Sequence, residues 1–231
     1  MHLIETRATY CRIRIVIPRG SLFKPVSEQF KAIGARLQEP DRAGFCGCGF
    51  EGGYENVEIV VRDRRMIPQL VGHGMFDAGI TGLDILVNSG IRTRIVGRLR
   101  EPESKWVLAS KCNWLPRSDG QSLIGAELRK LARKILANQN GLQRCQVTPI
   151  EGFEEQAIDD GLCEAVFIVS CTGKSLRESN LAIYPGCEEL FKSFPVLFLK
   201  RNADIDVRST IADLSRRLCI PLTDERRSIA H

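Results

Sequence analysis

The segment "RIRIVIPRGSLFKPVSEQFKAIGARL", residues 12–37, decides the fold class of this chain. Its first part, "RIRIVIP", alternates polar and apolar residues and then becomes fully apolar, as is typical of a strand entering the core of a sheet. After the turn "RGS", apolar residues recur at helical spacing, at Leu22, Phe23, Val26, Phe30 and Ile33. We therefore predict a strand, a turn at residues 19–21 and a helix. Such turns offer backbone N–H groups to anions.

The same order of elements recurs along the chain. Further strands are predicted at "NVEIVVR", "DAGIT", "SLIG", "CQVTPI", "EAVFIVS" and "PVLFL", and helical segments lie between or after them. Strands that alternate with helices of this length indicate parallel sheets built from βαβ units. A chain of 231 residues can form one large α/β domain or two small ones. Two lobes would leave a cleft at the carboxyl ends of their strands, where open α/β sheets bind ligands.

Composition restricts the possible functions. Hydrophobic residues make up 43% of the chain and charged residues 26%, as in ordinary soluble globular proteins. The net charge of +5 is modest and its basic residues are dispersed among acidic ones, so we expect no nucleic-acid binding. No apolar stretch approaches the twenty residues that a membrane span needs. The first residues contain no apolar export segment, so we expect a cytoplasmic location.

The nine cysteines are odd in number and irregularly spaced, which favours free thiols in a reducing compartment. Cys46 and Cys48, in "GFCGCGFEGG", would be half of a metal site only if a second Cys or His pair lay nearby at ligand spacing. The three histidines form no such pattern. We therefore expect free cysteines in a glycine-rich loop and no structural zinc.

The segment "VSCTGKSL", residues 169–176, is typical of a loop that holds a phosphate. It is not a nucleoside-triphosphatase P-loop, because Ile168 stands where that motif needs its first glycine. Backbone N–H groups at a helix N-terminus, the hydroxyls of Thr172 and Ser175 and the Lys174 ammonium would still make a compact anion site. The alternative is a helix cap with no ligand.

Two segments together resemble the short-form ATP phosphoribosyltransferases. They are "VVRDRRMIPQLVGHGMFDAGITGLDILVNSG", residues 60–90, and "AVFIVSCTGKSLRESNL", residues 165–181. Their residues fall in the family's order and spacing, and the chain is identified as a divergent member. The family joins ATP to phosphoribosyl pyrophosphate at the start of histidine biosynthesis. The resemblance implies two α/β lobes similar to the periplasmic binding protein type II fold, with the active site in the cleft. We assign residues 1–103 and 190–231 to the first lobe and 104–189 to the second.

The resemblance also implies a set of site residues. The 5′-phosphate of the phosphoribosyl donor would lie on Cys171, Thr172, Gly173, Lys174, Ser175 and Leu176. Arg19 and Arg62 are the candidate catalytic residues. The nucleotide would lie near Gly20, Ser21, Thr81, Gly82 and Asp84. The alternatives are a solvated strand end for Arg62 and turn chemistry for Asp84.

The implied reaction displaces pyrophosphate from the anomeric carbon of a ribose by a nitrogen nucleophile, through a transition state with oxocarbenium character. It needs cations on the leaving group and precise placement of the acceptor more than covalent help. The resemblance implies Mg²⁺ bound with the pyrophosphate substrate and a homo-oligomer. It also implies a separate regulatory subunit similar to histidyl-tRNA synthetase.

The chain departs from the family pattern at two positions. The family's first turn reads Lys-Gly-Arg, whereas this chain has Ser21 in the third place; losing such a cation costs about a hundredfold in rate unless Arg42, or Arg64 with Arg65, replaces it. The aspartate that precedes the family's phosphate loop aligns with Ile168, which cannot accept hydrogen bonds. Glu164 lies too far along the strand to be assumed a replacement.

These departures leave two alternatives open. One is a divergent paralogue that transfers the phosphoribosyl group to a different acceptor. The other is a non-catalytic module that binds a nucleotide or a sugar phosphate.

Overall fold

The computed structural model describes residues 12–38, 40–42, 45–46, 48–50, 54, 56–101, 103–170 and 174–220. The chain divides into two compact units. Unit 1 comprises Met1–Thr81, Ile91–Arg100 and Val196–His231, and unit 2 comprises Gly82–Gly90 and Glu101–Pro195. The boundaries between the units fall at residues 100 and 195, whereas the sequence analysis predicted 103 and 189. The segment 82–90, which was expected in the first lobe, groups with unit 2.

Unit 1 is built on a mixed sheet. Among the described residues its strand order is β15-β7-β14-β6-β1-β5-β3. The strands are β1 (Ile13–Pro18), β3 (Phe45–Cys46), β5 (Val57–Arg62), β6 (Ala78–Gly82), β7 (Thr93–Leu99), β14 (Pro195–Lys200) and β15 (Cys219–Ile220). β1 is parallel to both β5 and β6. Beside this sheet, β2 (Ala35–Leu37) pairs antiparallel with β4 (Cys48–Phe50).

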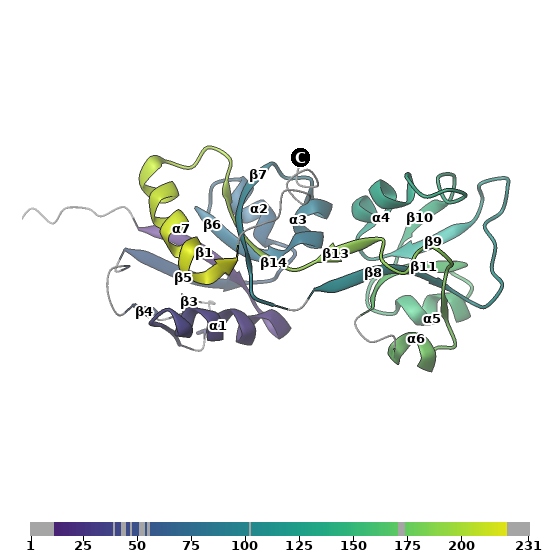
Figure 1. The fold of residues 1–231 in the computed structure, drawn as a ribbon, viewed down its shortest axis with the longest axis horizontal. Coiled ribbons are helices and arrows are strands. Elements are labelled where there is room, and N and C mark those ends of the chain that lie inside the picture. Colours follow the sequence, from purple (N-terminus) through teal and green to yellow (C-terminus); the bar gives the residue numbers. More distant parts are fainter. Residues whose placement is uncertain are drawn as a thin grey trace, which may run out of the picture. The chain divides into compact units, whose positions relative to one another are not determined.

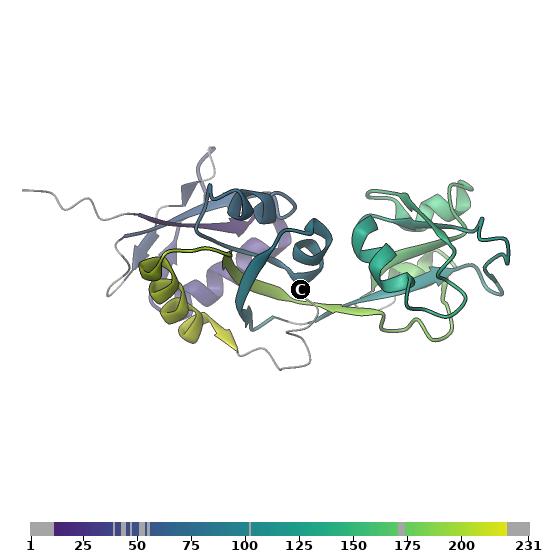
Figure 2. The same cartoon turned by 90° about the horizontal axis from the view of Figure 1, so that it is seen from above.

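Helices cover both faces of this sheet. Alternate residues of β1 pack in one core with α1 (Phe23–Ala32) and α7 (Ile205–Leu218), through Phe30 and Ile211 among others. On the other face, α2 (Ile67–Gly72) lies directly against Gly79 of β6. In Figure 2, the blue α2 and the yellow α7 lie on opposite sides of the sheet. The sheet is therefore buried on both faces, which explains the near-continuous apolar runs of its central strands.

Unit 2 is built on a second sheet, with the order β10-β9-β11-β8-β12 and β13 also paired to β8 among the described residues. Its strands are β8 (Ser104–Ser110), β9 (Leu123–Ala126), β10 (Gln146–Pro149), β11 (Ala165–Ser170), β12 (Ala182–Ile183) and β13 (Phe191–Ser193). β9, β10 and β11 are parallel, and β8 runs antiparallel to β11. Figure 1 shows α4 (Arg129–Leu136) on one side of this sheet and α5 (Glu154–Asp159) and α6 (Lys174–Glu178) on the other.

Helix α3 (Leu83–Ser89) follows β6 directly but belongs to unit 2. The side-chain oxygen of Asn88 accepts hydrogen bonds from the backbone N–H groups of Lys130 and Leu131, over 3.0 and 3.1 Å, at the start of α4. The Leu83 N–H donates to the carbonyl of Phe194 over 3.0 Å. These contacts explain why the predicted boundary differs, since sequence order alone places α3 with β6.

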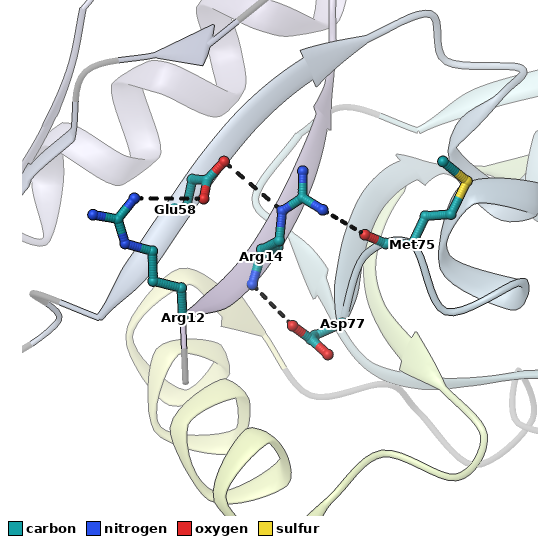
Figure 3. A network of polar contacts seen from close by, with 5 residues as sticks. All are labelled: Arg12, Arg14, Glu58, Met75 and Asp77. Carbon is teal, nitrogen blue, oxygen red and sulfur yellow. Dashed lines mark hydrogen bonds and ion pairs between the residues drawn. The ribbon is translucent and has the colours of Figure 1, made fainter. Parts of the chain in front are cut away.

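A charged network ties together the amino ends of the central strands of unit 1 (Figure 3). The backbone N–H of Arg14 donates to the Asp77 carboxylate over 3.0 Å, and its guanidinium donates to the Met75 carbonyl over 3.1 Å. Glu58 pairs with Arg14 at 3.8 Å and with Arg12 at 3.9 Å. This network occupies the amino edge of the sheet, so the predicted ligand-binding residues have to be sought at the carboxyl edge.

Candidate functional site

The carboxyl edge of the sheet in unit 1 brings the two candidate catalytic arginines together. Pro18 and Arg62 are register partners at the ends of β1 and β5. The backbone N–H of Arg19 donates to the Arg62 carbonyl over 2.9 Å. The Arg19 side chain is 68% exposed, and its Nε lies 3.8 Å from Oδ2 of Asp63. Asp63, which the sequence analysis did not assign to the site, therefore lies next to this cation.

The turn after β1 needs its glycine. Gly20 has φ +78°, a conformation that a side chain rarely adopts. It begins a single 3-10 turn, Gly20–Leu22, that leads into α1, and no described side chain caps this turn. Ser21 is exposed beside it. The turn therefore lies exposed at the predicted position, with Gly20 and Ser21 both open to solvent.

The loop after β5 carries further cations and is held by Thr81. Arg62 is half-buried and donates from Nη1 to the Val61 carbonyl over 2.7 Å. Arg64 and Arg65 are exposed. Thr81 is fully buried, and its hydroxyl donates to the Arg64 carbonyl over 3.1 Å. This predicted nucleotide contact therefore supports the loop that carries Arg64.

Gly82 and Asp84 form a tight junction in unit 2. A Cβ on Gly82 would lie 2.3 Å from Oδ1 of Asp84, so no side chain fits there while the carboxylate keeps its position. That carboxylate accepts hydrogen bonds from the backbone N–H of Ile85 over 2.8 Å and from Nε1 of Trp106 over 3.1 Å. The backbone N–H of Asp84 donates to the Ser193 hydroxyl over 3.1 Å. Asp84 thus anchors α3 to β8 and β13.

Trp106 extends this junction into the sheet of unit 2. Its indole is 3% exposed and stacks on Phe167 of β11, with ring centroids 4.9 Å apart. Phe167 precedes Ile168, so the chain of contacts from Asp84 reaches the strand that leads to the predicted phosphate loop. The sequence analysis missed Trp106. A tryptophan within an apolar strand usually finds an acceptor for its indole N–H, and that requirement was the signal that could have pointed to Trp106.

The predicted phosphate loop follows β11. Cys171, Thr172 and Gly173 lie outside the described residues, so their predicted roles stay predictions. Lys174 and Ser175 begin α6, as the predicted strand, loop and helix require. Leu176 is 3% exposed and packs in the core with Val107, Ile158 and Ile168. Its side chain anchors the helix, and it could meet a phosphate only through its backbone.

Ile168 and Glu164 lie as the sequence suggested. Ile168 is 6% exposed within the apolar core, so its side chain offers a ligand no hydrogen bond. Glu164 lies just before the other end of β11, where it accepts hydrogen bonds from Nε1 of Trp114 over 3.2 Å and pairs with Nε of Arg117 at 3.3 Å. The Ser122 hydroxyl, followed by these partners, lowers the pKa of Glu164. It is a structural carboxylate and no substitute for the family's aspartate.

Three candidates from the sequence analysis remain, namely Arg42, Cys46 and Cys48. Arg42 is exposed in a turn. Cys46 lies on β3 and Cys48 on β4, two strands that pair with different partners. The described part of the chain holds no group of three or more His, Cys, Asp or Glu side chains that could bind a metal ion. Within the same residues, every helix is too short or too polar to cross a membrane.

Comparison with known proteins shows which family this chain resembles. The sequence model of the family described as ATP phosphoribosyltransferase matches residues 63–219. The ATP phosphoribosyltransferase of Sulfolobus acidocaldarius is 31% identical over 177 residues, which cover 73% of this chain and 59% of that protein. The chain spans 53% to 59% of the length of several curated relatives that it matches.

Solved structures share the fold. A chain of the ATP phosphoribosyl transferase (HisG:HisZ) complex from Thermotoga maritima aligns with a TM-score of 0.74 and 19% identity, covering 94% of this chain and 98% of that one. The alkanesulfonate-binding protein SsuA from Xanthomonas axonopodis pv. citri aligns with a TM-score of 0.53 and 12% identity, covering 90% and 71%. The predicted α/β fold, similar to that of periplasmic binding proteins, is confirmed.

Proposed function

The chain belongs to the ATP phosphoribosyltransferase family, and from this membership we propose that it joins phosphoribosyl pyrophosphate to N1 of ATP with release of pyrophosphate. This reaction would be a step of histidine biosynthesis. One observation carries the proposal beyond the family match: the carboxyl ends of β1 and β5 hold Arg19 and Arg62 side by side, with Arg64 and Arg65 on the adjoining loop.

The proposed chemistry follows from charge. As the anomeric carbon loses pyrophosphate, positive charge develops on the ribose ring and negative charge on the leaving group. Guanidinium groups that are already oriented stabilise developing phosphate charge without reorganising. The Arg19 side chain, exposed beside Asp63, would supply such a cation at the end of β1. We assign Arg19 and Arg62 to the phosphates of the two substrates.

The remaining roles are divided between the two units. In unit 1, the backbone N–H groups of Gly20 and Ser21 would bind the nucleotide, and Thr81 would fix the loop of Arg64. In unit 2, Gly82 and Asp84 would position α3, and the loop from Cys171 to Leu176 would bind the 5′-phosphate of the donor. The Arg at the family's third turn position is replaced here by Ser21, and the exposed Arg64 and Arg65 on the loop after β5 are the candidates to replace it.

Mg²⁺ would enter with the substrate. The cation commonly binds through one or two carboxylates together with substrate phosphates and several waters, and needs no protein cage. When bound, the ion would supply charge neutralisation on the leaving diphosphate, while the residues of the chain bind and orient the two substrates.

We also propose the assembly and location that the sequence suggested. The Thermotoga relative is a HisG:HisZ complex, which supports a regulatory partner for this chain, similar to histidyl-tRNA synthetase, and a homo-oligomer. A cytoplasmic location fits a pathway enzyme with free cysteines.

The test is product formation. Purified chain is incubated with ATP, phosphoribosyl pyrophosphate and Mg²⁺, with and without a histidyl-tRNA-synthetase-like partner, and phosphoribosyl-ATP is followed by absorbance and mass. We expect product only when both substrates are present, and its loss in Lys174→Ala. If no product forms under any of these conditions while ATP and phosphoribosyl pyrophosphate each still raise the melting temperature, the proposal is overturned. That result would point to another acceptor or to a binding role.

A further inference from the structure

A cavity of about 330 Å³ lies in unit 2 between the end of α4 and the first residues of β10. Figure 1 shows these two elements beside each other. The walls of the cavity come from the last turn of the helix, the connection that follows it and the start of the strand. A volume of this size suits a small organic molecule.

Much of the cavity is lined by apolar side chains. Leu136 and Leu142 are 2% and 1% exposed, and Val147 is 8% exposed. Ala137 lines the same cavity and is open to solvent. An apolar group of a ligand would pack against these side chains and lose its contact with water, which favours binding.

One cation stands at this cavity. Arg133 is exposed, and its Nη2 lies 3.5 Å from the Val147 carbonyl, at the limit of a hydrogen bond. Within the described part of the chain, this guanidinium forms no ion pair. The described residues that line the cavity include no acidic side chain. Because a guanidinium has five N–H donors, most of those on Arg133 are available to an anion.

A backbone donor lies beside this guanidinium. The N–H of Gln146 donates to the Ser122 carbonyl, next to β9, over 2.9 Å. Adjacent residues of a strand direct their backbone groups to opposite edges, so the N–H and the carbonyl of Val147 point away from β9. Among the described strands β10 ends the sheet, so no neighbouring strand pairs with this edge. Since Arg133 contacts the Val147 carbonyl there, the Val147 N–H points to the side where the guanidinium lies.

This edge suits a small molecule better than an added peptide strand. An extended peptide would pair with the outward N–H groups along the strand. The next outward position after Val147 is Pro149, which has no N–H. One backbone donor beside one guanidinium instead matches a single carboxylate, whose two oxygens accept from both.

The cavity lies at a different edge of the sheet from the residues assigned to the substrates. β9, β10 and β11 are parallel, so their amino ends share one edge. The cavity lies at the amino end of β10, whereas Lys174 and Ser175 follow the carboxyl end of β11. A ligand in the cavity would therefore be a third molecule, distinct from the two substrates.

We propose that this cavity binds a small organic carboxylate with an aliphatic body and no ammonium group. The carboxylate accepts hydrogen bonds from Arg133 and from the Val147 N–H, and the aliphatic body packs against Leu136, Ala137 and Leu142. An amino acid fits less well, because no acidic side chain among the described lining residues would pair with its ammonium group. The inference does not depend on the proposed function.

Cys145 provides a reporter within the cavity. It lines the cavity and is half-buried, whereas Cys112, also in unit 2, is exposed. Burial, followed by the charge of Glu164, raises the pKa of Cys145, so its thiol reacts slowly and a further decrease is measured against the faster Cys112.

The experiment is alkylation of the full chain with iodoacetamide at mildly alkaline pH, with each thiol followed by peptide mass spectrometry. The probe is isocaproate, a branched aliphatic carboxylate. We expect it to slow the alkylation of Cys145, with half of the effect at about 1 mM or below, as for a small ligand. The alkylation rate of Cys112 should stay unchanged.

Three further molecules test the chemistry of the ligand. Isohexanol lacks the charge, acetate lacks the aliphatic body, and leucine adds an ammonium group. Each should need about tenfold more than isocaproate to protect Cys145 to the same extent, since each loses one of the interactions that carry the proposal.

Two variants and a matched control test the residues. Arg133→Met should raise the protecting concentration of isocaproate about tenfold or more. Arg129→Met removes the same charge one turn earlier on α4, from an exposed residue outside the cavity, and should change nothing. Ala137→Phe fills the cavity from an exposed position and should abolish protection, while its melting temperature stays close to that of the wild type.

Several results would overturn the inference. They are no protection of Cys145 by isocaproate in the wild type, equal protection by isohexanol or leucine, and unchanged protection in Arg133→Met. Equal slowing at Cys112, or an equal loss in Arg129→Met, would indicate a general effect and would overturn it too. The proposed function is tested separately, because a chain that makes no phosphoribosyl-ATP can still show the expected protection.

Discussion

The indole N–H of Trp106 donates a hydrogen bond to the Asp84 carboxylate over 3.1 Å. The two residues belong to different elements of unit 2, α3 and β8. Asp84 was expected to bind the nucleotide, but this contact gives it a structural role, because it holds α3 on the sheet. Since Trp106 also stacks on Phe167, the contact links α3 to the strand before the predicted phosphate loop.

We expect Asp84→Ala and Trp106→Phe to be coupled. Removal of the carboxylate leaves a buried indole N–H without its acceptor, which costs about 1–3 kcal/mol of unfolding free energy. In the double variant that N–H is gone, so the combined loss should be smaller than the sum of the two single losses by about 0.5 kcal/mol or more. Urea unfolding of the four proteins measures this. Strict additivity would show that the contact contributes nothing.

Gly82→Ala tests the tight turn before α3. The added Cβ would meet Oδ1 of Asp84, which accepts from the Ile85 N–H while Oδ2 accepts from the Trp106 indole, so we expect a loss of about 1–3 kcal/mol of unfolding free energy, as for other overpacked sites. The same change in an Asp84→Ala background should cost much less, because the clashing atom is absent. Equal costs in the two backgrounds would contradict the geometry. Thermal unfolding of both pairs provides the measurement.

Arg19→Ala should lower kcat/KM about a hundredfold without lowering the melting temperature, since its exposed guanidinium makes one long ion pair. Asp63→Asn should have a smaller effect in the same direction, because it loosens the orientation of Arg19 without removing the charge. The control is Arg201→Ala, at an exposed turn after β14. Steady-state kinetics with both substrates separate the three, and equal losses for Arg19 and Arg201 would indicate a general charge effect.

Asp77→Asn should destabilise unit 1 and leave binding intact. Asp77 accepts from the backbone N–H of Arg14 and pairs with Lys200 at 3.3 Å, at the amino edge of the sheet. Loss of the charge should cost about 0.5–2 kcal/mol. We expect KM values for both substrates within about twofold of wild type. A large rise in either KM would mean that this edge also takes part in binding.

Tyr54 gives a prediction for alkaline pH. Burial, followed by its hydrogen bond to the Asp213 carboxylate, raises the pKa of this phenol from 10.0 to about 12. Because the folded pKa lies above the unfolded one, the stabilisation is complete below pH 10.0 and is lost as the pH rises toward about 12. Absorbance titration of wild type and Tyr54→Phe should reveal one phenol ionising near that upper value.

Asp213→Asn should bring this titration back toward 10.0, because the variant loses the negative charge that opposes ionisation. Arg216→Ala, which removes a charge at 2.9 Å from the same carboxylate, should leave the phenol protonated to the same high pH or higher. A Tyr54 that ionises at its ordinary pH in the wild type would contradict the contact.

Much of the fold could be predicted because its signals are local. The alternation in "RIRIVIP" and the helical spacing after it gave β1 and α1 with their connecting turn, and the resemblance gave the confirmed architecture. The sequence analysis named Arg19 and Arg62 as candidates but did not place them side by side, because the pairing of β1 with β5 joins segments far apart in the sequence.

The contacts that could not be predicted join residues far apart in the sequence. Nothing near Asp84 indicates that Trp106 and Ser193 will contact it, so no signal in the sequence separates α3 from β6. Thr81 was expected to contact the nucleotide because of its motif. Its side chain is buried, and its hydroxyl donates to the Arg64 carbonyl. The opposition of Lys105 on β8 to Ser170 on β11 and to Lys192 on β13 depends on strand register, which composition and spacing do not determine.

The way the chain alternates between its two units bears on how it is made. The central strand β6 of unit 1 borders β14, which the ribosome produces only after the whole of unit 2 has emerged. Until residues 195–220 appear, the nascent sheet has an unpaired edge beside β6 and lacks the apolar face of α7. Unpaired strand edges promote aggregation in incomplete chains. Unit 2 can therefore fold during synthesis while unit 1 waits, and chaperone dependence should be concentrated in unit 1.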